Sequence, residues 1–594
     1  MLVILDLKFS SLKTLCESIG NASNLEVLDL SWATCLTSLP DSFWALGKLK
    51  ILDLSTSGID SLPEAFGSLS LLEDLNFESC WKLTKLPDSF GGLRKLKTLR
   101  LDTSGFESLP ESFGSLSLLE DLDFEGCWKL TKLPDSFGDL KNLKTLGLQF
   151  SGIESLPESF GSLSSLEDLN LRVCKKLTKL PDSFGGLRKL KTLRLDTSGF
   201  ESLPESFGSL SLLEDLDFEG CWKLTKLPDS FGDLKNLKTL GLQFSGIESL
   251  PESFGSLSSL EDLNLRVCEK LTKLRDSFGG LRKLKTLRLD TSGFESLPES
   301  FGSLSLLEDL DFEGCWKLTK LPDSFGDLKN LKTLGLQFSG IESLPESFGS
   351  LSSLEDLNLR VCKKLTKLPD SFGGLRKLKT LRLDTSGFES LPESFGSLSL
   401  LEDLDFEGCW KLTKLPDSFG DLKNLKTLGL QFSGIESLPE SFGSLSSLED
   451  LNLRVCKKLT KLPDSFGGLR KLKTLRLDTS GFESLPESFG SLSLLEDLDF
   501  QSCWKLTQLP DSFGDLKKLK TLGLEFSGIE SLPESFGSLR SLEDLNLRIC
   551  TKLTKLPDSF GGLKKLKRLR LNFSGLESLR ESLRSLSSLE NVDT

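Results

Sequence analysis

The chain has 594 residues, and its 73 Lys and Arg residues against 87 Asp and Glu residues give a formal net charge of −14. It contains no His, which excludes Ser-His-Asp and Cys-His catalytic groups, His-ligated metals and an imidazole proton switch. The acidic balance argues against nucleic acid and against an anionic membrane as partners, because both require a cationic face. The hydrophobic fraction of 38% is sufficient for a folded core.

Proline marks an internal repeat. Pro40, Pro63 and Pro87 are separated by 23 and then 24 residues, and all 22 prolines follow this alternating spacing. Arg275 and Arg580 occupy two of the expected proline positions. Repeats with such a period are typical of solenoids and other arrays.

The spacing predicts one array of 24 repeats over residues 15–578, alternating between 24 and 23 residues, with partial repeats at 1–14 and 579–594. Four successive repeats form a set that recurs every 94 residues. One aspartate marks the same place in each set, namely Asp102, Asp196, Asp290, Asp384 and Asp478.

Within one repeat, Leu96, Leu99 and Leu101 form the pattern L-x-x-L-x-L, followed by Ser104 and Phe106. This resembles the leucine-rich repeat, L-x-x-L-x-L-x-x-N/C-x-L, and the resemblance covers essentially the entire chain. It implies an α/β solenoid, a horseshoe or superhelix with a parallel β-sheet on the concave face and short helical or irregular segments on the convex face.

The side-chain pattern is consistent with that fold. Alternate residues in L-x-L point to one face, as in a strand, while Pro87, Phe90 and Leu93 are expected on the returning convex side. Each turn can bury its leucines only against its neighbours, so the predicted core is continuous along the array.

Cysteine follows the same period. Eleven of the 13 cysteines, from Cys80 and Cys127 to Cys550, recur every 47 residues, and Ser104 shows the residue that replaces them in the other repeats. Cysteines two turns apart are separated by about 9 to 10 Å, beyond the reach of a disulfide, about 7 Å. We therefore expect inward thiols that donate to backbone carbonyls, with no metal or redox role.

Many reduced thiols indicate a reducing compartment. The apolar N-terminal segment lacks a basic region and is interrupted by Asp6, so it is not a signal peptide. No apolar run approaches the ~20 residues that span a membrane. We expect a cytoplasmic protein.

The outward residues of the predicted strands form columns across the sheet. In the first column, Glu73, Lys97, Glu120 and Lys144 alternate in sign, and each cross-strand pair should stabilise the sheet by about 0.2 to 1 kcal/mol. Asp102 and its equivalents are also expected on the exposed face. We interpret the charged column as a solvated surface that fixes the register.

Aromatic and arginine side chains interrupt this polar face once per set. The phenylalanines are Phe150, Phe244, Phe338, Phe432 and Phe526, and the arginines one turn further on are Arg172, Arg266, Arg360, Arg454 and Arg548. Both residue types are enriched at interface hot spots, so these ten residues form the candidate site for a protein partner on the concave face. The alternative is that the phenylalanines tuck against the rim loop.

Tryptophans directly follow cysteines of the 47-residue series, as at Trp128, Trp222, Trp316, Trp410 and Trp504. We expect them to pack on the rim with their indole N–H groups in water.

No catalytic centre is predicted. Paired carboxylates such as Glu120 and Asp121 recur without forming one enclosed pocket, and the sequence contains neither G-x-x-x-x-G-K-[ST] nor G-x-G-x-x-G. The chain is therefore expected to be non-enzymatic, with no catalytic residue, cofactor or metal.

The run Cys-Trp-Lys-Leu-Thr-Lys-Leu-Pro, from Cys127 to Pro134, resembles the C-x-x-L-x-x-L-P pattern of plant intracellular disease-resistance receptors of the NBS-LRR and TIR-NBS-LRR types. In that family the repeats sense pathogen effectors and restrain an upstream nucleotide-binding switch domain, often preceded by a Toll-like domain. This sequence shows neither domain, so only the recognition role carries over. The resemblance implies the ligand-sensing part of a plant defence-response protein.

Two other interpretations remain. The first is an intracellular signal-transduction scaffold similar to the Ras-group leucine-rich repeat proteins. The second is a truncated or non-functional repeat array, because the 94-residue copies are nearly identical. In addition, Leu2, Val3 and Ile4 begin the sequence without a polar cap. We therefore expect either edge-to-edge self-association through the N-terminal strand or that the chain belongs to a longer protein.

Overall fold

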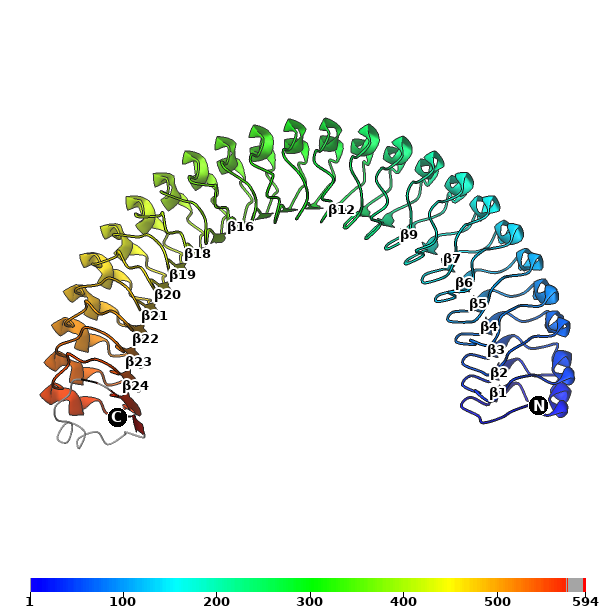
Figure 1. Cartoon of the computed structure of the whole chain (residues 1–594), viewed down its shortest axis with the longest axis horizontal. Coiled ribbons are helices and arrows are strands. Elements are labelled where there is room, and N and C mark those ends of the chain that lie inside the picture. The colour runs from blue at the N-terminus through cyan, green and yellow to red at the C-terminus, as the bar shows by residue number, and fades with distance from the viewer. Residues whose placement is uncertain (1, 573, 575–590, 594) are drawn as a thin grey trace. The chain divides into compact units, whose positions relative to one another are not determined.

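The computed structural model describes residues 2–572, 574 and 591–593. The chain divides into two compact units, unit 1 from Met1 to Phe294 and unit 2 from Glu295 to Thr594. Each unit consists of repeated turns of the chain. A turn contains a short strand, which lies on the inner side of the curved unit, and a 3₁₀-helix, which lies on the outer side (Figure 1).

Three-residue strands pair in parallel with the strands that precede and follow them within each unit. The strands of unit 1 are β1 (Ile4–Asp6), β2 (Val27–Asp29), β3 (Ile51–Asp53), β4 (Asp74–Asn76), β5 (Thr98–Arg100), β6 (Asp121–Asp123), β7 (Thr145–Gly147), β8 (Asp168–Asn170), β9 (Thr192–Arg194), β10 (Asp215–Asp217), β11 (Thr239–Gly241), β12 (Asp262–Asn264) and β13 (Thr286–Arg288). Those of unit 2 are β14 (Asp309–Asp311), β15 (Thr333–Gly335), β16 (Asp356–Asn358), β17 (Thr380–Arg382), β18 (Asp403–Asp405), β19 (Thr427–Gly429), β20 (Asp450–Asn452), β21 (Thr474–Arg476), β22 (Asp497–Asp499), β23 (Thr521–Gly523), β24 (Asp544–Asn546), β25 (Arg568–Arg570) and β26 (Asn591–Asp593).

Five-residue 3₁₀-helices alternate with the strands. Unit 1 contains η1 (Glu17–Asn21), η2 (Asp41–Ala45), η3 (Glu64–Ser68), η4 (Asp88–Gly92), η5 (Glu111–Ser115), η6 (Asp135–Asp139), η7 (Glu158–Ser162), η8 (Asp182–Gly186), η9 (Glu205–Ser209), η10 (Asp229–Asp233), η11 (Glu252–Ser256) and η12 (Asp276–Gly280). Unit 2 contains η13 (Glu299–Ser303), η14 (Asp323–Asp327), η15 (Glu346–Ser350), η16 (Asp370–Gly374), η17 (Glu393–Ser397), η18 (Asp417–Asp421), η19 (Glu440–Ser444), η20 (Asp464–Gly468), η21 (Glu487–Ser491), η22 (Asp511–Asp515), η23 (Glu534–Ser538) and η24 (Asp558–Gly562).

The central leucine fixes the register of each strand. Leu240 of β11 lies opposite Leu216 of β10 and Leu263 of β12, and all three are buried. Because side chains alternate along a strand, the residues on either side of each leucine face outward. A slip of one residue would expose the whole row of leucines.

Proline begins most of the 3₁₀-helices, as the sequence pattern indicates. Pro392 precedes η17 with φ −72° and ψ 153°, and its missing N–H costs nothing at a helix start, where that group has no intrahelical partner. Arg275 adopts nearly the same backbone before η12, with φ −81° and ψ 160°. Proline is therefore favourable at this position without being required.

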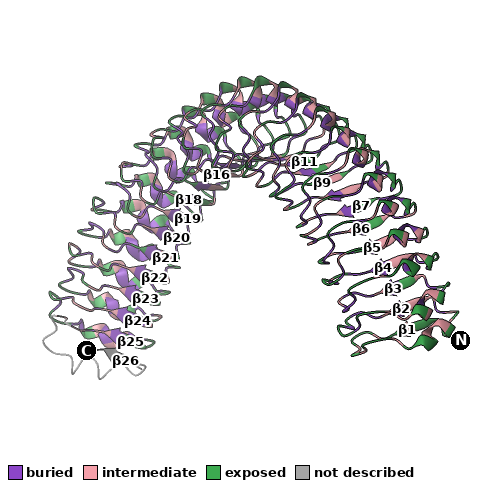
Figure 2. Cartoon of the chain, turned by 45° about the vertical axis from the view of Figure 1, so that its right-hand side comes forward, coloured by how far each residue is buried: buried purple, intermediate pink, exposed green. Residues whose placement is uncertain are grey.

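Phenylalanines inside the 3₁₀-helices form stacks along each unit. Phe395 lies 6.0 Å from Phe372 and 6.1 Å from Phe419 between ring centroids, with interplanar angles of 2° and 5°. Gly396 allows the neighbouring helix to approach this closely, since an added Cβ would collide with the Ser418 carbonyl oxygen. In Figure 2, buried and exposed residues alternate along the turns of both units.

The expected α/β solenoid, with a parallel sheet on one side and short helices on the other, is confirmed. The array limits at residues 15 and 578 stay predictions. The C-terminal partial repeat predicted for 579–594 lies outside the described residues except for 591–593.

Candidate functional site

The predicted phenylalanines lie in the turns that follow the strands. Phe432 is the third residue after β19, and its φ of +58° places it in the left-handed region, where the chain leaves the sheet. Its side chain is 48% exposed. The sequence analysis placed Phe432 on the sheet face, whereas the structure places it at the carboxyl edge of the sheet.

The structure brings each candidate phenylalanine and arginine together through the backbone. The N–H of Phe432 donates to the carbonyl oxygen of Arg454 at 2.9 Å. The equivalent bonds join Phe150 to Arg172, Phe244 to Arg266, Phe338 to Arg360 and Phe526 to Arg548. Hydrogen bonding between turns therefore continues beyond the strands and carries both residues to the same edge.

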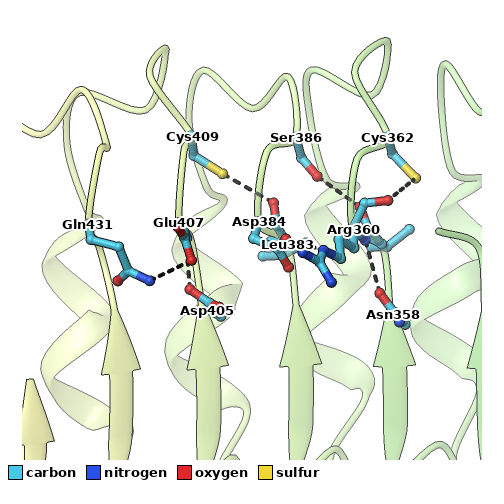
Figure 3. Close-up of polar contacts among 11 residues, drawn as sticks. Asn358, Arg360, Cys362, Leu383, Asp384, Ser386, Asp405, Glu407, Cys409 and Gln431 are labelled. Carbon is cyan, nitrogen blue, oxygen red and sulfur yellow. Dashed lines mark hydrogen bonds and ion pairs between the residues drawn. The ribbon is translucent and has the colours of Figure 1, made fainter. Parts of the chain in front are cut away.

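The side chains of four of the five arginines reach an aspartate of the following turn, and the fifth, Arg548, has Asn572 at that position. Nε of Arg360 lies 2.6 Å from Oδ2 of Asp384, whose side chain is 8% exposed (Figure 3). The equivalent pairs are Arg172 with Asp196, Arg266 with Asp290 and Arg454 with Asp478, at 2.5 to 2.7 Å.

These contacts correct the prediction that the marker aspartates are exposed. Asp196, Asp290, Asp384 and Asp478 are buried. The prediction assumed that side chains continue to alternate between the two faces of the sheet from strand β17 through Leu383 to Asp384. The strand ends at Arg382, however, and Thr385 already has a φ of +57°. Once the backbone turns, the period of two no longer decides which side chain faces water.

Burial raises the pKa of Asp384, and the charge of Arg360 opposes the rise. The first set differs, because Asp102 has Glu78 in place of an arginine on the preceding turn. Burial, followed by the charge of Glu78, raises the pKa of Asp102 to about 6. The same chain therefore contains this aspartate both with an arginine beside it, as at Asp384, and with a glutamate in place of the arginine, as at Asp102.

The tryptophans correct a second prediction. Trp410 is 68% exposed, and Nζ of Lys411 lies 5.5 Å from the centroid of its ring. These indoles are not packed against the rim, because the preceding Cys409 is buried and the next side chain points outward. We use the name aromatic edge for the five candidate phenylalanines together with the tryptophans that follow the buried cysteines, which line this edge within each unit. They are Phe150, Phe244, Trp81, Trp128 and Trp222 in unit 1 and Phe338, Phe432, Phe526, Trp316, Trp410 and Trp504 in unit 2.

The predicted inward thiols are confirmed. Sγ of Cys409 donates to the carbonyl oxygen of Leu383 at 3.1 Å, and Oγ of Ser386 donates to that of Leu359 at 2.8 Å (Figure 3). Burial raises the pKa of Cys409 to about 12. The thiol and the hydroxyl thus satisfy carbonyl groups at the corner of each turn.

The predicted charge ladder is also present. Nζ of Lys97 lies 2.6 Å from Oε2 of Glu73, and Lys144 and Glu120 are the same distance apart. Both pairs are exposed to water, so each contributes little to the stability of the fold. The ladder lies just before strands β5 and β7 and orders neighbouring turns.

A series of hollows that the residue pattern did not predict lies on the sheet face. One of them, of about 320 Å³, lies over Gly241 at the end of β11 and is lined by Asp217, Asn264, Arg194 and Arg288 among others. Similar hollows of about 430, 370 and 270 Å³ lie over Gly147, Gly429 and Gly523. We call these four cavities the glycine hollows.

A sequence signal for the hollows exists. The last strand position cycles through Arg194, Asp217, Gly241 and Asn264, so one turn in four presents no side chain there. The gap can be recognised only when the register of the strands is known, because the lining residues come from separate turns.

No group of three or more His, Cys, Asp or Glu residues that could hold a metal ion occurs in the part of the chain that the structure describes. Among the same residues, no helix has the length and apolar character needed to cross a membrane.

Comparison with known proteins places these features in context. A model of the leucine-rich repeat region matches residues 44–128, 122–221, 169–295, 275–368, 323–414, 404–509 and 498–594. None of the curated proteins matches the chain significantly.

Several solved structures are similar. The plant peptide hormone receptor RGFR1 in complex with RGF2 shares 24% identity over 92% of this chain and 89% of that chain, with a TM-score of 0.51. The PEPR1–AtPEP1 structure shares 24% over 98% and 87%, with a TM-score of 0.46. The TLR13–ssRNA13 complex shares 24% over 98% and 89%, with a TM-score of 0.48.

The matched regions overlap from residue 44 to residue 594, and the described turns carry the strand, inward leucines and outer helix that the repeat requires. The chain therefore belongs to the leucine-rich repeat family.

Proposed function

We propose that this chain recognises another protein through its aromatic edge. The observation that carries the proposal is the recurrence of exposed aromatic side chains, with Phe432 48% and Trp410 68% exposed. Exposed aromatic side chains are enriched at protein interfaces and supply much of the binding energy there. The ion pair of Arg454 with Asp478 holds the arginine at this edge while leaving more than half of its side chain accessible.

We further propose that the partner is a pathogen effector and that the chain acts in plant defence as the sensing part of a disease-resistance protein. The run from Cys127 to Pro134, with its C-x-x-L-x-x-L-P pattern, supports this assignment. The free cysteines support a cytoplasmic location. The complex of RGFR1 with RGF2 is an example of this fold carrying a ligand.

Proximity labelling in plant cells that express pathogen effectors tests the recognition role. In the test variant, all five phenylalanines of the aromatic edge are replaced by serine. The matched control replaces five other exposed apolar residues by serine, namely Leu71, Leu212, Leu306, Leu400 and Leu494.

We expect the native chain and the leucine variant to label the same effector, and the phenylalanine variant to lose at least nine tenths of that signal. A phosphatase or small GTPase lost in the same way would favour the signalling scaffold over the defence receptor. Unchanged labelling by the phenylalanine variant would show that the phenylalanines of the aromatic edge do not take part in recognition.

The apparent mass of the native protein distinguishes the receptor from the scaffold. An antibody against the repeat should detect a band well above the 65.6 kDa of this sequence if a switch domain precedes it. A band near 65.6 kDa would favour the scaffold.

A further inference from the structure

The glycine hollows lie on the sheet face, and among the residues that the structure describes no other element of the same unit covers this face (Figure 1). Gly241 faces Asp217 on one side and Asn264 on the other. A Cβ at Gly241 would collide with Oδ1 of Asp217 and lie 3.0 Å from Oε1 of Gln243. Two oxygen acceptors therefore border the space that the missing side chain leaves.

The glutamine oxygen is an acceptor without a donor. Nε2 of Gln243 donates to Oε2 of Glu219 at 2.8 Å, and a carboxylate accepts only from the nitrogen end of an amide. Oε1 must therefore point away from Glu219, and it is buried without a hydrogen-bond partner. Gln149 and Gln431 repeat both features at the hollows over Gly147 and Gly429. At the hollow over Gly523 the same place is taken by Glu525, which adds an acceptor with a negative charge.

Acidic side chains outnumber basic ones around each glycine hollow. Over Gly429, the lining contains Asp403, Asp405 and Asp450 against Arg382 and Arg476. Burial raises the pKa of Asp405, which means that the neighbouring hydrogen bonds and cations only partly compensate its negative charge. A partner that donates hydrogen bonds and carries positive charge would supply both the missing donor and the missing positive charge.

The hollows also recur at a fixed interval. Within unit 1, those over Gly147 and Gly241 are four strands apart, as are those over Gly429 and Gly523 within unit 2. At about 4.8 Å per strand the interval is roughly 19 Å. An extended chain covers that distance in about six residues, at about 3.3 Å per residue.

We propose that each glycine hollow binds one lysine or arginine side chain, and that the protein partner presents these side chains about six residues apart on an extended basic segment that crosses the strands. This inference rests on the proposed recognition role and specifies the chemistry of the partner. The aromatic edge, which borders the same face, would contact the apolar part of that partner.

Fluorescence anisotropy with the full chain and labelled peptides tests the proposal. The test peptide carries two arginines six residues apart in a Gly/Ser background. Comparison peptides carry the same two arginines three residues apart, a single arginine, or two glutamates. We expect the six-residue spacing to bind at least tenfold more tightly than the other peptides, because two hollows are engaged together.

A protein variant locates the site. Replacing Asp123, Asp217, Asp405 and Asp499 by asparagine removes one charge from each hollow. Asparagine fits there because Asn170 Oδ1 accepts the N–H of Arg172 just as Asp217 Oδ1 accepts that of Glu219. The matched control makes the same change at four exposed aspartates that begin outer helices, namely Asp135, Asp229, Asp417 and Asp511.

We expect the hollow variant to lose at least tenfold in affinity for the six-residue peptide and the outer-face variant to lose less than twofold. Equal losses in the two variants would mean non-specific attraction to an acidic protein and would overturn the proposal. Equal affinity for the two arginine spacings would overturn the proposal that the partner presents its basic side chains about six residues apart.

The two proposals fail in different ways. If the hollow variant keeps the effector that the native chain labels and peptide binding shows no site, the inference is wrong while recognition stands. If the peptide binds as expected but the phenylalanine variant keeps every labelled protein, the hollows bind cations and the recognition role of the phenylalanines is wrong.

Discussion

Arg360 and Asp384 form an unequal ion pair between adjacent turns of unit 2. The carboxylate side chain is 8% exposed and the arginine side chain 57%. Water can therefore solvate the guanidinium without help from Asp384, whereas the carboxylate depends on Arg360 for compensation. A buried charge that loses its partner pays most of its desolvation cost.

Replacing Arg360 by methionine should destabilise the turns around Asp384 by about 1 to 3 kcal/mol. Amide hydrogen exchange is the suitable measurement, because the N–H of Val361 donates to the carbonyl oxygen of Asp384 at 2.9 Å and its protection reports the local opening. The double replacement Arg360→Met with Asp384→Asn should recover most of the loss. Equal protection in the single and double variants would contradict a stabilising role for the pair.

The stability of the turn around Asp102 should depend on pH. Its pKa is raised to about 6 by burial and by the charge of Glu78, whereas in the unfolded chain the carboxyl titrates near its ordinary value of about 4. The folded state therefore binds this proton more tightly. The surrounding turn should be least stable above about pH 6 and become more stable as pH falls from about 6 toward 4.

The amide of Ser79, which donates to the carbonyl oxygen of Asp102 at 2.8 Å, should show this gain as increased protection after correction for intrinsic exchange. Replacing Glu78 by arginine installs the arrangement of Arg172 with Asp196. That variant should lower the pKa of Asp102 and flatten the response. A pH profile that does not change in the variant would argue against Glu78 as a cause.

Thiol reactivity should divide the cysteines into two classes. Cys16 and Cys35 are exposed, and the other eleven are buried. Burial raises the pKa of Cys127 to about 11 and that of Cys221 to about 12, so these thiols carry little thiolate near neutral pH.

With an aromatic disulfide reagent at pH 8, we expect two thiols to react rapidly and eleven to react only after denaturation. Replacing both Cys16 and Cys35 by serine should abolish the fast phase and leave the slow phase unchanged. Fast release of more than two thiols from the native chain would mean that the interior opens readily.

The turn after each strand requires a left-handed residue, and the four turns of a set supply Thr197, Gly220, Phe244 and Val267 at that place. A branched side chain is strained there. Thr197→Gly should therefore stabilise its turn by up to about 1 kcal/mol, because the relief of strain exceeds the entropy cost of glycine.

The reverse change, Gly220→Thr, should destabilise its turn by about 1 to 2 kcal/mol. Thermal unfolding followed by circular dichroism, together with local hydrogen exchange, would measure both variants. Changes of the same sign in the two variants would show that contacts of the side chain outweigh the backbone preference.

Much of the fold is contained in the sequence because the repeat is short and each turn meets only its neighbours. The spacing of Leu96, Leu99 and Leu101 predicts the strand and its inward face, and the proline period predicts the start of each outer segment. The cysteine interval excludes disulfides and predicts inward thiols. These features depend on geometry within one turn and its neighbours, so they can be predicted from the spacing of the repeat and the residue type at each position.

The site was harder to predict, because its residues come from different turns. That Asp384 is buried follows from the change of backbone direction after Leu383, and the exposure of Trp410 follows from its place beside the inward Cys409. The pairing of Arg360 with Asp384 joins residues of two turns across a bend that alternation does not describe.

The repeat, the parallel sheet and the inward leucine core follow from the amino-acid pattern alone, since each is a property of one turn and its copies. Which polar side chains face water, which carboxylates have a cation beside them and where the glycines leave hollows depends on the folded chain. These properties depend on how neighbouring turns are set against one another, because burial and charge compensation are produced by residues that are distant in sequence and close in space.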